Sequence, residues 1–129
     1  MDDSLAAYTR RTGATRSRVI GTALGEWLRT ERHPQIRFVE PAPGERRASV
    51  AGGPEVWSVA EAWLQHPEGE RTVDQVALTL GLRPGQVEAA LAYWADNREE
   101  IDSLVARIHA AQDEAFAAWE RRREIDRLP

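Results

Sequence analysis

The stretch Thr72-Val-Asp-Gln-Val-Ala-Leu-Thr-Leu-Gly-Leu-Arg-Pro-Gly-Gln-Val-Glu-Ala-Ala-Leu-Ala-Tyr-Trp94 decides the fold class. Its apolar residues recur every three or four positions, first before Gly81 and again after Pro84, which indicates two amphipathic helices. Thr72 has the side chain of a helix N-cap and Gly81 can end the first helix. Pro84 fits the first turn of the second helix, where its missing N–H is not needed. The stretch therefore predicts a helix-turn-helix-like pair.

Helical spacing continues on both sides of this pair. Residues 55–65 place Val, Trp, Ala and Leu side chains on one face, and residues 101–119 carry apolar positions that thin out along a helix of mixed charge. The tryptophans Trp57, Trp63 and Trp94 fall on the apolar faces and are expected in the core. We therefore expect a three-helix domain followed by a long charged helix.

The sequence that precedes this domain predicts a β-hairpin and two more helices. Residues 36–51 contain two β-rich runs separated by the turn-like segment 41–44. A short helical pattern ends at Gly13, and Thr15 or Ser17 can cap a second, longer helix. The hairpin would then connect this second helix to the three-helix domain.

These patterns predict a mainly α-helical chain in three parts. Residues 1–32 form a small helical module of the DNA-binding type, and residues 33–101 hold the short β-hairpin and the helix-turn-helix-like three-helix domain. Residues 102–129 form the long, charged C-terminal helix.

Composition excludes several classes of protein. The sequence has no Cys, which rules out disulfides and thiolate metal sites, and no apolar run approaches the roughly 18 residues of a membrane span. No secretory signal is recognised, so we expect a cytoplasmic protein. His33, His66 and His109 lie in different predicted elements, and no Ser/His/Asp set or phosphate-binding glycine loop occurs. We expect no enzyme, no catalytic residues, no metal site and no cofactor.

Charge is unevenly distributed along the chain. Residues 1–47 carry nine Arg against six acidic residues, a net +3, whereas residues 48–100 carry three against nine, a net −6. The N-terminal part is therefore the better candidate for contact with nucleic acid. Arg83 and Gln86 open the would-be recognition helix of the second part, but its negative charge favours a role in packing or dimerisation.

The segment Leu5-Ala-Ala-Tyr-Thr-Arg-Arg-Thr-Gly-Ala-Thr-Arg-Ser-Arg-Val-Ile-Gly-Thr-Ala-Leu-Gly-Glu-Trp-Leu28 resembles the two helices of ribbon-helix-helix antitoxins and repressors. The resemblance implies DNA binding by a dimer, with backbone N–H groups at the start of the second helix holding phosphate. The implied DNA-binding residues are Arg10, Arg11, Thr15, Arg16, Ser17 and Arg18. The implied dimer core is Val19, Ile20, Ala23, Leu24 and Trp27.

Other interpretations of this segment stay open. In the ribbon-helix-helix family a base-reading β-strand precedes the first helix, and this sequence begins after that point, so the strand is either truncated or absent. The two helices also fit a helix-turn-helix whose wing is the 36–51 hairpin, or a plain helical hairpin that supports the next domain.

Residues 33–101 resemble the family known as domain of unknown function 433, which occurs among VapB-type antitoxins that partner PIN or PIN-like toxins. The matching features are His33-Pro-x-Ile36, Gly53-Pro-Glu-Val-Trp57, Thr72-Val-Asp-Gln-Val-Ala77, Leu82-Arg-Pro-Gly-Gln-Val-Glu-Ala-Ala-Leu-Ala-Tyr-Trp94 and Asn97-Arg-Glu-Glu-Ile101. The resemblance implies a PIN-like ribonuclease toxin as the protein partner.

The C-terminal run from residue 116 to 127 combines aromatic and Arg side chains, a composition common in interface hot spots. A guanidinium can pair with the clustered carboxylates that hold divalent metal in PIN-type catalysis. The predicted toxin-binding residues are Phe116, Trp119, Arg121, Arg122 and Arg123. A solvated helix end with internal ion pairs is the alternative.

Together these observations predict an antitoxin that represses its own transcription. It would act as a homodimer that binds operator DNA and a PIN-like toxin, with no role for a membrane. Two alternatives stay open: a transcription regulator that has no toxin, and a structural dimerisation adaptor that has no nucleic-acid role.

Overall fold

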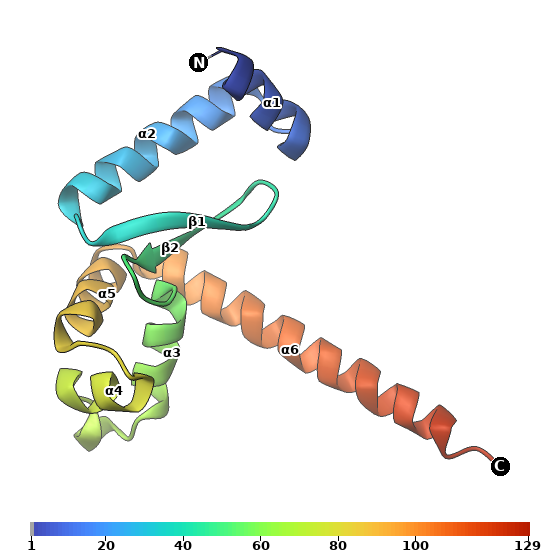
Figure 1. Ribbon diagram of the computed structural model, residues 1–129. Coiled ribbons are helices and arrows are strands. Elements are labelled where there is room, and N and C mark those ends of the chain that lie inside the picture. The colour runs from blue at the N-terminus through green and yellow to red at the C-terminus, as the bar shows by residue number, and fades with distance from the viewer. Residues whose placement is uncertain (1) are drawn as a thin grey trace.

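The computed structural model describes residues 2–129 and is mainly helical, as predicted, with one antiparallel hairpin (Figure 1). The elements, in chain order, are α1 (Asp2–Thr12), α2 (Arg16–Arg32), β1 (Ile36–Ala42), β2 (Glu45–Val50), α3 (Val56–Gln65), the 3-10 helix η1 (Glu68–Glu70), α4 (Val73–Leu80), α5 (Pro84–Asp96) and α6 (Arg98–Asp126). The hairpin lies between α2 and the α3–α5 domain. Within residues 2–129, no helix combines the length and the apolar character needed to cross a membrane.

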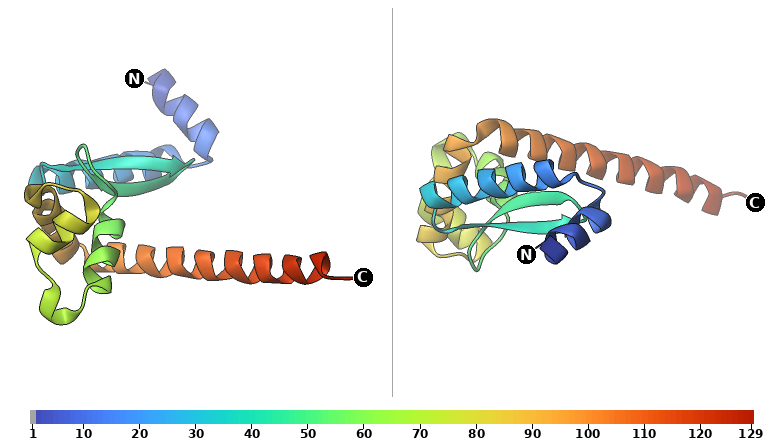
Figure 2. Two further views of the ribbon diagram at one scale, coloured as in Figure 1. Left: turned by 60° about the horizontal axis from the view of Figure 1, so that its bottom comes forward. Right: turned by 90° about the horizontal axis from the view of Figure 1, so that it is seen from above.

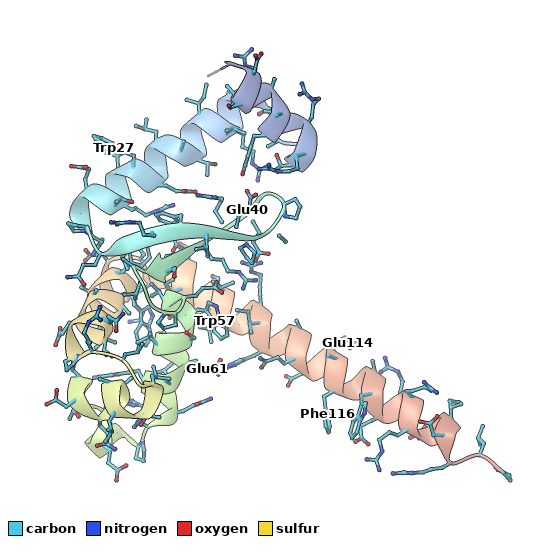
Figure 3. The ribbon with its side chains drawn as sticks, viewed as in Figure 1. Trp27, Glu40, Trp57, Glu61, Glu114 and Phe116 are labelled. Carbon is cyan, nitrogen blue, oxygen red and sulfur yellow. The ribbon has the colours of Figure 1, made fainter. Side chains whose placement is uncertain are left out.

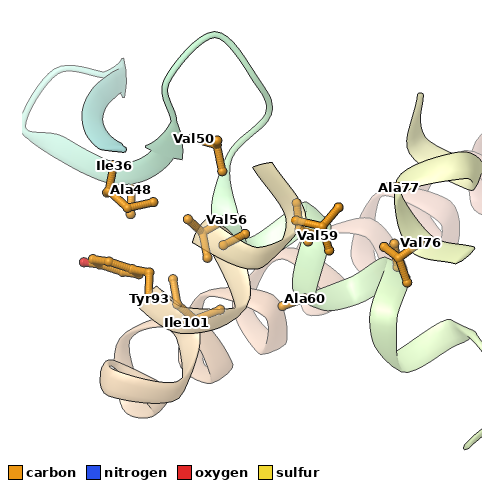
Figure 4. Close-up of a cluster of buried hydrophobic side chains, with 13 residues drawn as sticks. Ile36, Ala48, Val50, Val56, Val59, Ala60, Val76, Ala77, Tyr93 and Ile101 are labelled. Carbon is orange, nitrogen blue, oxygen red and sulfur yellow. The ribbon is translucent and has the colours of Figure 1, made fainter. Parts of the chain in front are cut away.

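The hydrophobic core lies where α3, α4 and α5 meet the hairpin and the start of α6 (Figure 4). Val59, Val76 and Val87 come from three different helices and are fully buried, and Ile36 of β1 and Ile101 of α6 join them. Each such aliphatic side chain contributes about 1.5–3 kcal/mol when buried. The tryptophans that we expected in the core are only partly buried and pack against its edge: Trp57, Trp63 and Trp94.

The turn between α4 and α5 is built as the sequence predicts. Thr72 caps α4, because its side-chain oxygen accepts the N–H of Gln75 at 3.1 Å. Gly81 ends α4 in the left-handed conformation, with φ of +68°, which a residue with a Cβ avoids. Pro84 is the first residue of α5. These local signals set where α4 ends and where α5 begins.

The predicted hairpin is confirmed, and β1 runs two residues further, to Ala42, than expected. Ile36 pairs with Val50 and Phe38 with Ala48 across the two strands. Ile36, Ala48 and Val50 are buried in the core, whereas the ring of Phe38 is only partly covered. Gly44 supplies the positive φ, +81°, that the short connection requires.

Helix α2 lies along the hairpin with its polar side inward. Glu26 accepts two hydrogen bonds from Arg46 of β2, at 2.9 and 2.8 Å. The guanidinium of Arg29 lies 4.9 Å from the centre of the Phe38 ring. None of the α2 residues is buried. The hairpin therefore covers the charged side of α2 and leaves its apolar side uncovered.

Helix α6 consists of a packed start and a projecting remainder. Ile101 and Leu104 are buried against the domain, and His109 Nε2 lies 2.8 Å from Glu61 Oε2 of α3. Residues 110–126, termed the arm from here on, extend away from the domain (Figures 1 and 2). The side-chain contacts recorded for the arm in the described part of the chain are all internal to α6.

Gly81 is expected to be needed for the α4–α5 turn. Gly81→Ala places a Cβ in the left-handed region and should lower the free energy of unfolding by about 1–2 kcal/mol. Gly85→Ala is the matched control, because Gly85 is helical and no atom lies within 4 Å of the position a Cβ would take. It should leave stability unchanged or slightly higher. Urea denaturation measures both, and equal losses would contradict the role of Gly81.

Candidate interaction surfaces

The side of α2 that faces away from the hairpin is apolar and uncovered. Ile20, Leu24 and Trp27 are exposed by 56, 56 and 58%, and Leu28 by 52%. Helical spacing places these four side chains, termed the outward face of α2, on the side opposite the hairpin contacts. Contiguous exposed apolar patches are rare on monomeric proteins and often mark an interaction site.

The structure divides the predicted dimer core between two places. Ile20, Leu24 and Trp27 lie on the outward face, whereas Val19 and Ala23 border a cavity of about 240 Å³ between α1, α2 and the hairpin. Leu28 was not among the predicted core residues but belongs to the outward face. The signal for Leu28 was its position four residues after Leu24, on the same side of the helix.

The predicted phosphate-binding residues of α2 come together in its first turn. Arg16, Ser17 and Arg18 are exposed there. Thr15 caps the helix, because its side-chain oxygen accepts the N–H of Arg18 at 3.2 Å. That bond occupies one of the N–H groups that a phosphate would otherwise use. The side chains of this turn remain open to solvent.

The hairpin partly neutralises the positive charge that the arginines of α1 were predicted to offer to DNA. Arg10 is exposed in the last turn of α1, but Arg11 lies 3.5 Å from the carboxylate of Glu40 on β1. Tyr8 donates a hydrogen bond to the same carboxylate at 2.8 Å. The pKa of Tyr8 is raised by this bond, and further by burial, because ionisation would place two negative groups side by side.

The structure contradicts a base-reading role for Gln86. This side chain is only 7% exposed, and its oxygen accepts the N–H of Arg83 at 3.0 Å, which caps α5. A buried side chain that holds a helix terminus cannot enter a groove of DNA. Sequence spacing placed Gln86 at the start of the helix correctly but did not reveal which way it points. Arg83 itself is exposed.

The predicted toxin-binding residues lie on the arm, and three of them form one cluster. Phe116 and Trp119 are exposed by 61 and 51%, and their ring centres are 5.7 Å apart. Arg123 lies 4.7 Å above the Trp119 ring. Arg121 and Arg122 are instead within 3.3 and 3.1 Å of acidic residues of the same helix. The cluster therefore offers two aromatic rings and one guanidinium stacked on a ring.

Sequence reasoning missed the polar joint between α2 and the domain. Tyr93 is fully buried and donates to the two carboxylate oxygens of Glu100 at 2.8 and 3.0 Å. Burial above all, and then Glu100, raises the pKa of Tyr93. Arg29 of α2 lies 3.6 Å from Glu100, and His33 Nε2 lies 2.9 Å from Asp96. Helical spacing carried no signal for this joint, which becomes evident only once Tyr93 is seen to be buried, because a buried tyrosine hydroxyl needs a partner.

The outward face of α2 and the arm cluster point in different directions. In Figure 3, Trp27 lies on the side of α2 away from the hairpin, whereas Phe116 lies on the opposite edge of the molecule. One partner bound at the arm would therefore leave the outward face of α2 accessible.

Comparisons with known proteins add no relative. No protein-family model, no curated protein and no solved structure matches this chain. Among residues 2–129, no three His, Asp or Glu side chains gather in a way that could hold a metal ion.

The pKa of Tyr8 tests whether α1 is held to the hairpin in solution. Glu40→Gln should shift this pKa down toward 10, because the carboxylate is the main cause of its elevation. Because the pKa of Tyr8 is higher in the folded state than in the unfolded state, the hydrogen bond from Tyr8 to Glu40 stabilises the fold below about pH 10. This stabilisation is lost as pH rises through the folded-state pKa. Tyrosinate absorbance measures the pKa of Tyr8. Glu100→Gln, which changes the carboxylate beside the other tyrosine, Tyr93, is the control.

Proposed function

We propose that this protein is a homodimeric antitoxin that represses its own transcription and neutralises a PIN-like ribonuclease toxin. The observation that supports it best is the inverted placement of α2, which directs its charged side to its own hairpin and its apolar side to solvent. A helix with this arrangement buries its apolar side only when another chain covers it.

The DNA-binding role is supported by the first turn of α2. Arg16 and Arg18 are exposed beside the N-terminal end of the helix, where backbone dipoles favour a phosphate. Arg10 adds a further exposed cation nearby in the sequence. The second domain is a poorer candidate, because residues 48–100 carry a net charge of −6 and Gln86 is buried.

The toxin-binding role is supported by the arm. Exposed Phe116 and Trp119 supply the aromatic anchors that dominate many interfaces, and Arg123 is held by the Trp119 ring rather than by a carboxylate. A guanidinium presented in this way can pair with the metal-binding carboxylates of a PIN-like nuclease. Such a pair would compete with the metal ion and so block catalysis.

Two other functions fit part of these observations. A transcription regulator without a toxin would use α2 but leave the arm cluster without a role. A dimerisation adaptor would use the outward face of α2 but would give no role to the exposed arginines of its first turn.

DNA binding is testable by gel shift with the DNA upstream of the gene. Replacing Arg16 and Arg18 by Ala should weaken binding at least tenfold and reduce the slope of log affinity against log salt by about 2. Arg83→Ala is the matched control, since Arg83 is an exposed arginine at the start of α5. Loss of binding with Arg83→Ala alone would place the DNA contact in the second domain instead.

The proposal predicts that a PIN-like ribonuclease is encoded beside the gene, and toxin binding is testable by titrating that ribonuclease. Trp119→Ala should weaken inhibition about 30-fold or more, as expected for a central aromatic anchor. Leu78→Ala is the control, because Leu78 is an even more exposed apolar residue on α4. If the two variants inhibit equally well, the arm is not the toxin-binding surface.

A further inference from the structure

The outward face of α2 is spaced so that it can pack against a copy of itself. Ile20, Leu24, Trp27 and Glu31 follow one another at intervals of four, three and four residues, the spacing of a coiled-coil seam. When a second copy of α2 lies antiparallel to the first with the two Leu24 side chains together, Leu28 of one copy lies opposite Ile20 of the other. Resting on the homodimer of the proposed function, we propose that the α2 helices of two copies pack antiparallel on this face, with the two-fold axis beside Leu24.

Charge favours the antiparallel arrangement over the parallel one. Arg16 lies at the N-terminal end of this side of α2 and Glu31 at its C-terminal end. Antiparallel packing places each Glu31 beside Arg16 and the positively polarised helix N-terminus of the second copy. Parallel packing would place like charges together at both ends. Within residues 2–129, Glu31 has no recorded hydrogen bond or ion pair, so its carboxylate is available for this contact.

No other element of the chain, among residues 2–129, covers the outward face of α2. The opposite side of α2 is occupied, since Glu26 pairs with Arg46 and Arg29 contacts Phe38. The arm projects from the far side of the hairpin (Figures 1 and 3). A second copy of α2 matches the face in length, spacing and terminal charge at once.

The area of the face sets the strength of the dimer. The four side chains are each slightly more than half exposed, which corresponds to roughly 100 Å² apiece and about 400 Å² per copy. A stable interface buries about 800 Å² per partner. The seam therefore gives a dimer that forms at high protein concentration and dissociates on dilution.

The antiparallel seam also sets where the first turns of α2 and the arms lie in the dimer. α2 has 17 residues and spans about 25 Å, so the Arg-containing first turns of the two copies lie about 25 Å apart, at opposite ends of the seam. Each arm lies on the far side of its own hairpin from the seam, so it remains open to a partner protein (Figure 1). One dimer then presents two phosphate-binding turns and two arms.

Cysteine cross-linking tests the direction of the seam, because the natural chain has no Cys. Full-length chains carrying Ile20→Cys and Leu28→Cys are mixed and oxidised, and a covalent heterodimer is expected. Each variant alone should give little product, since two equivalent positions eight residues apart along the seam are about 12 Å apart, beyond disulfide reach. Leu24→Cys alone should cross-link, whereas Leu78→Cys on α4 should not.

The outcomes separate the seam from the dimer itself. Efficient cross-linking of Ile20→Cys alone, or none in the mixture while sedimentation shows a dimer, overturns the antiparallel seam but leaves the homodimer. A wild-type chain that stays monomeric at every concentration overturns the homodimer and the seam together.

Charge reversal gives a second measurement that does not depend on oxidation. Glu31→Arg should weaken dimerisation about three- to tenfold, because it acts at both ends of the seam. Adding Arg16→Glu to the same chain should restore the wild-type dissociation constant. If the double variant is weaker than the single one, the two residues do not face each other.

Discussion

The bidentate ion pair between Glu26 of α2 and Arg46 of β2 orients the N-terminal part of the molecule. The Glu26 side chain is only 12% exposed, so the pair is partly shielded from water and binds more strongly than an ordinary surface pair. Its hydrogen bond raises the pKa of Arg46. Together with Arg29, which contacts Phe38 and Glu100, it holds the charged side of α2 against the hairpin. The direction of every apolar side chain on α2 follows from this contact.

This placement of α2 leaves apolar surface in water while it covers a charged side chain. A monomer that exposes Leu24 and Trp27 while it covers Glu26 gives up hydrophobic burial at roughly 25 cal/mol for each Å² of apolar surface left in water. A second chain bound on this face would recover that free energy, reduced by the entropy cost of association. The hairpin thus holds α2 with its apolar side toward solvent.

The arm is a different kind of surface, because it lacks tertiary support. Isolated helices shorter than about 12–15 residues are marginal in water, but the arm continues from Ile101 and Leu104, which are packed in the core and spare it the cost of nucleation. Phe116 and Trp119 are therefore carried on a preformed helix at a distance from the domain (Figure 1). A preordered element loses less conformational entropy on binding than a flexible tail.

The sequence by itself determined the local elements of this protein, because their signals act within a few residues. Thr72, Gly81 and Pro84 define the α4–α5 turn through capping and backbone geometry, and the alternation in residues 36–51 defines the hairpin. The resemblance to ribbon-helix-helix proteins also singled out the stripe of apolar residues on α2. Only the tertiary structure decided that this stripe faces solvent, that Gln86 is buried and that Tyr93 pairs with Glu100. Those outcomes depend on contacts between helices and strands, and an apolar face in a sequence does not specify which surface covers it.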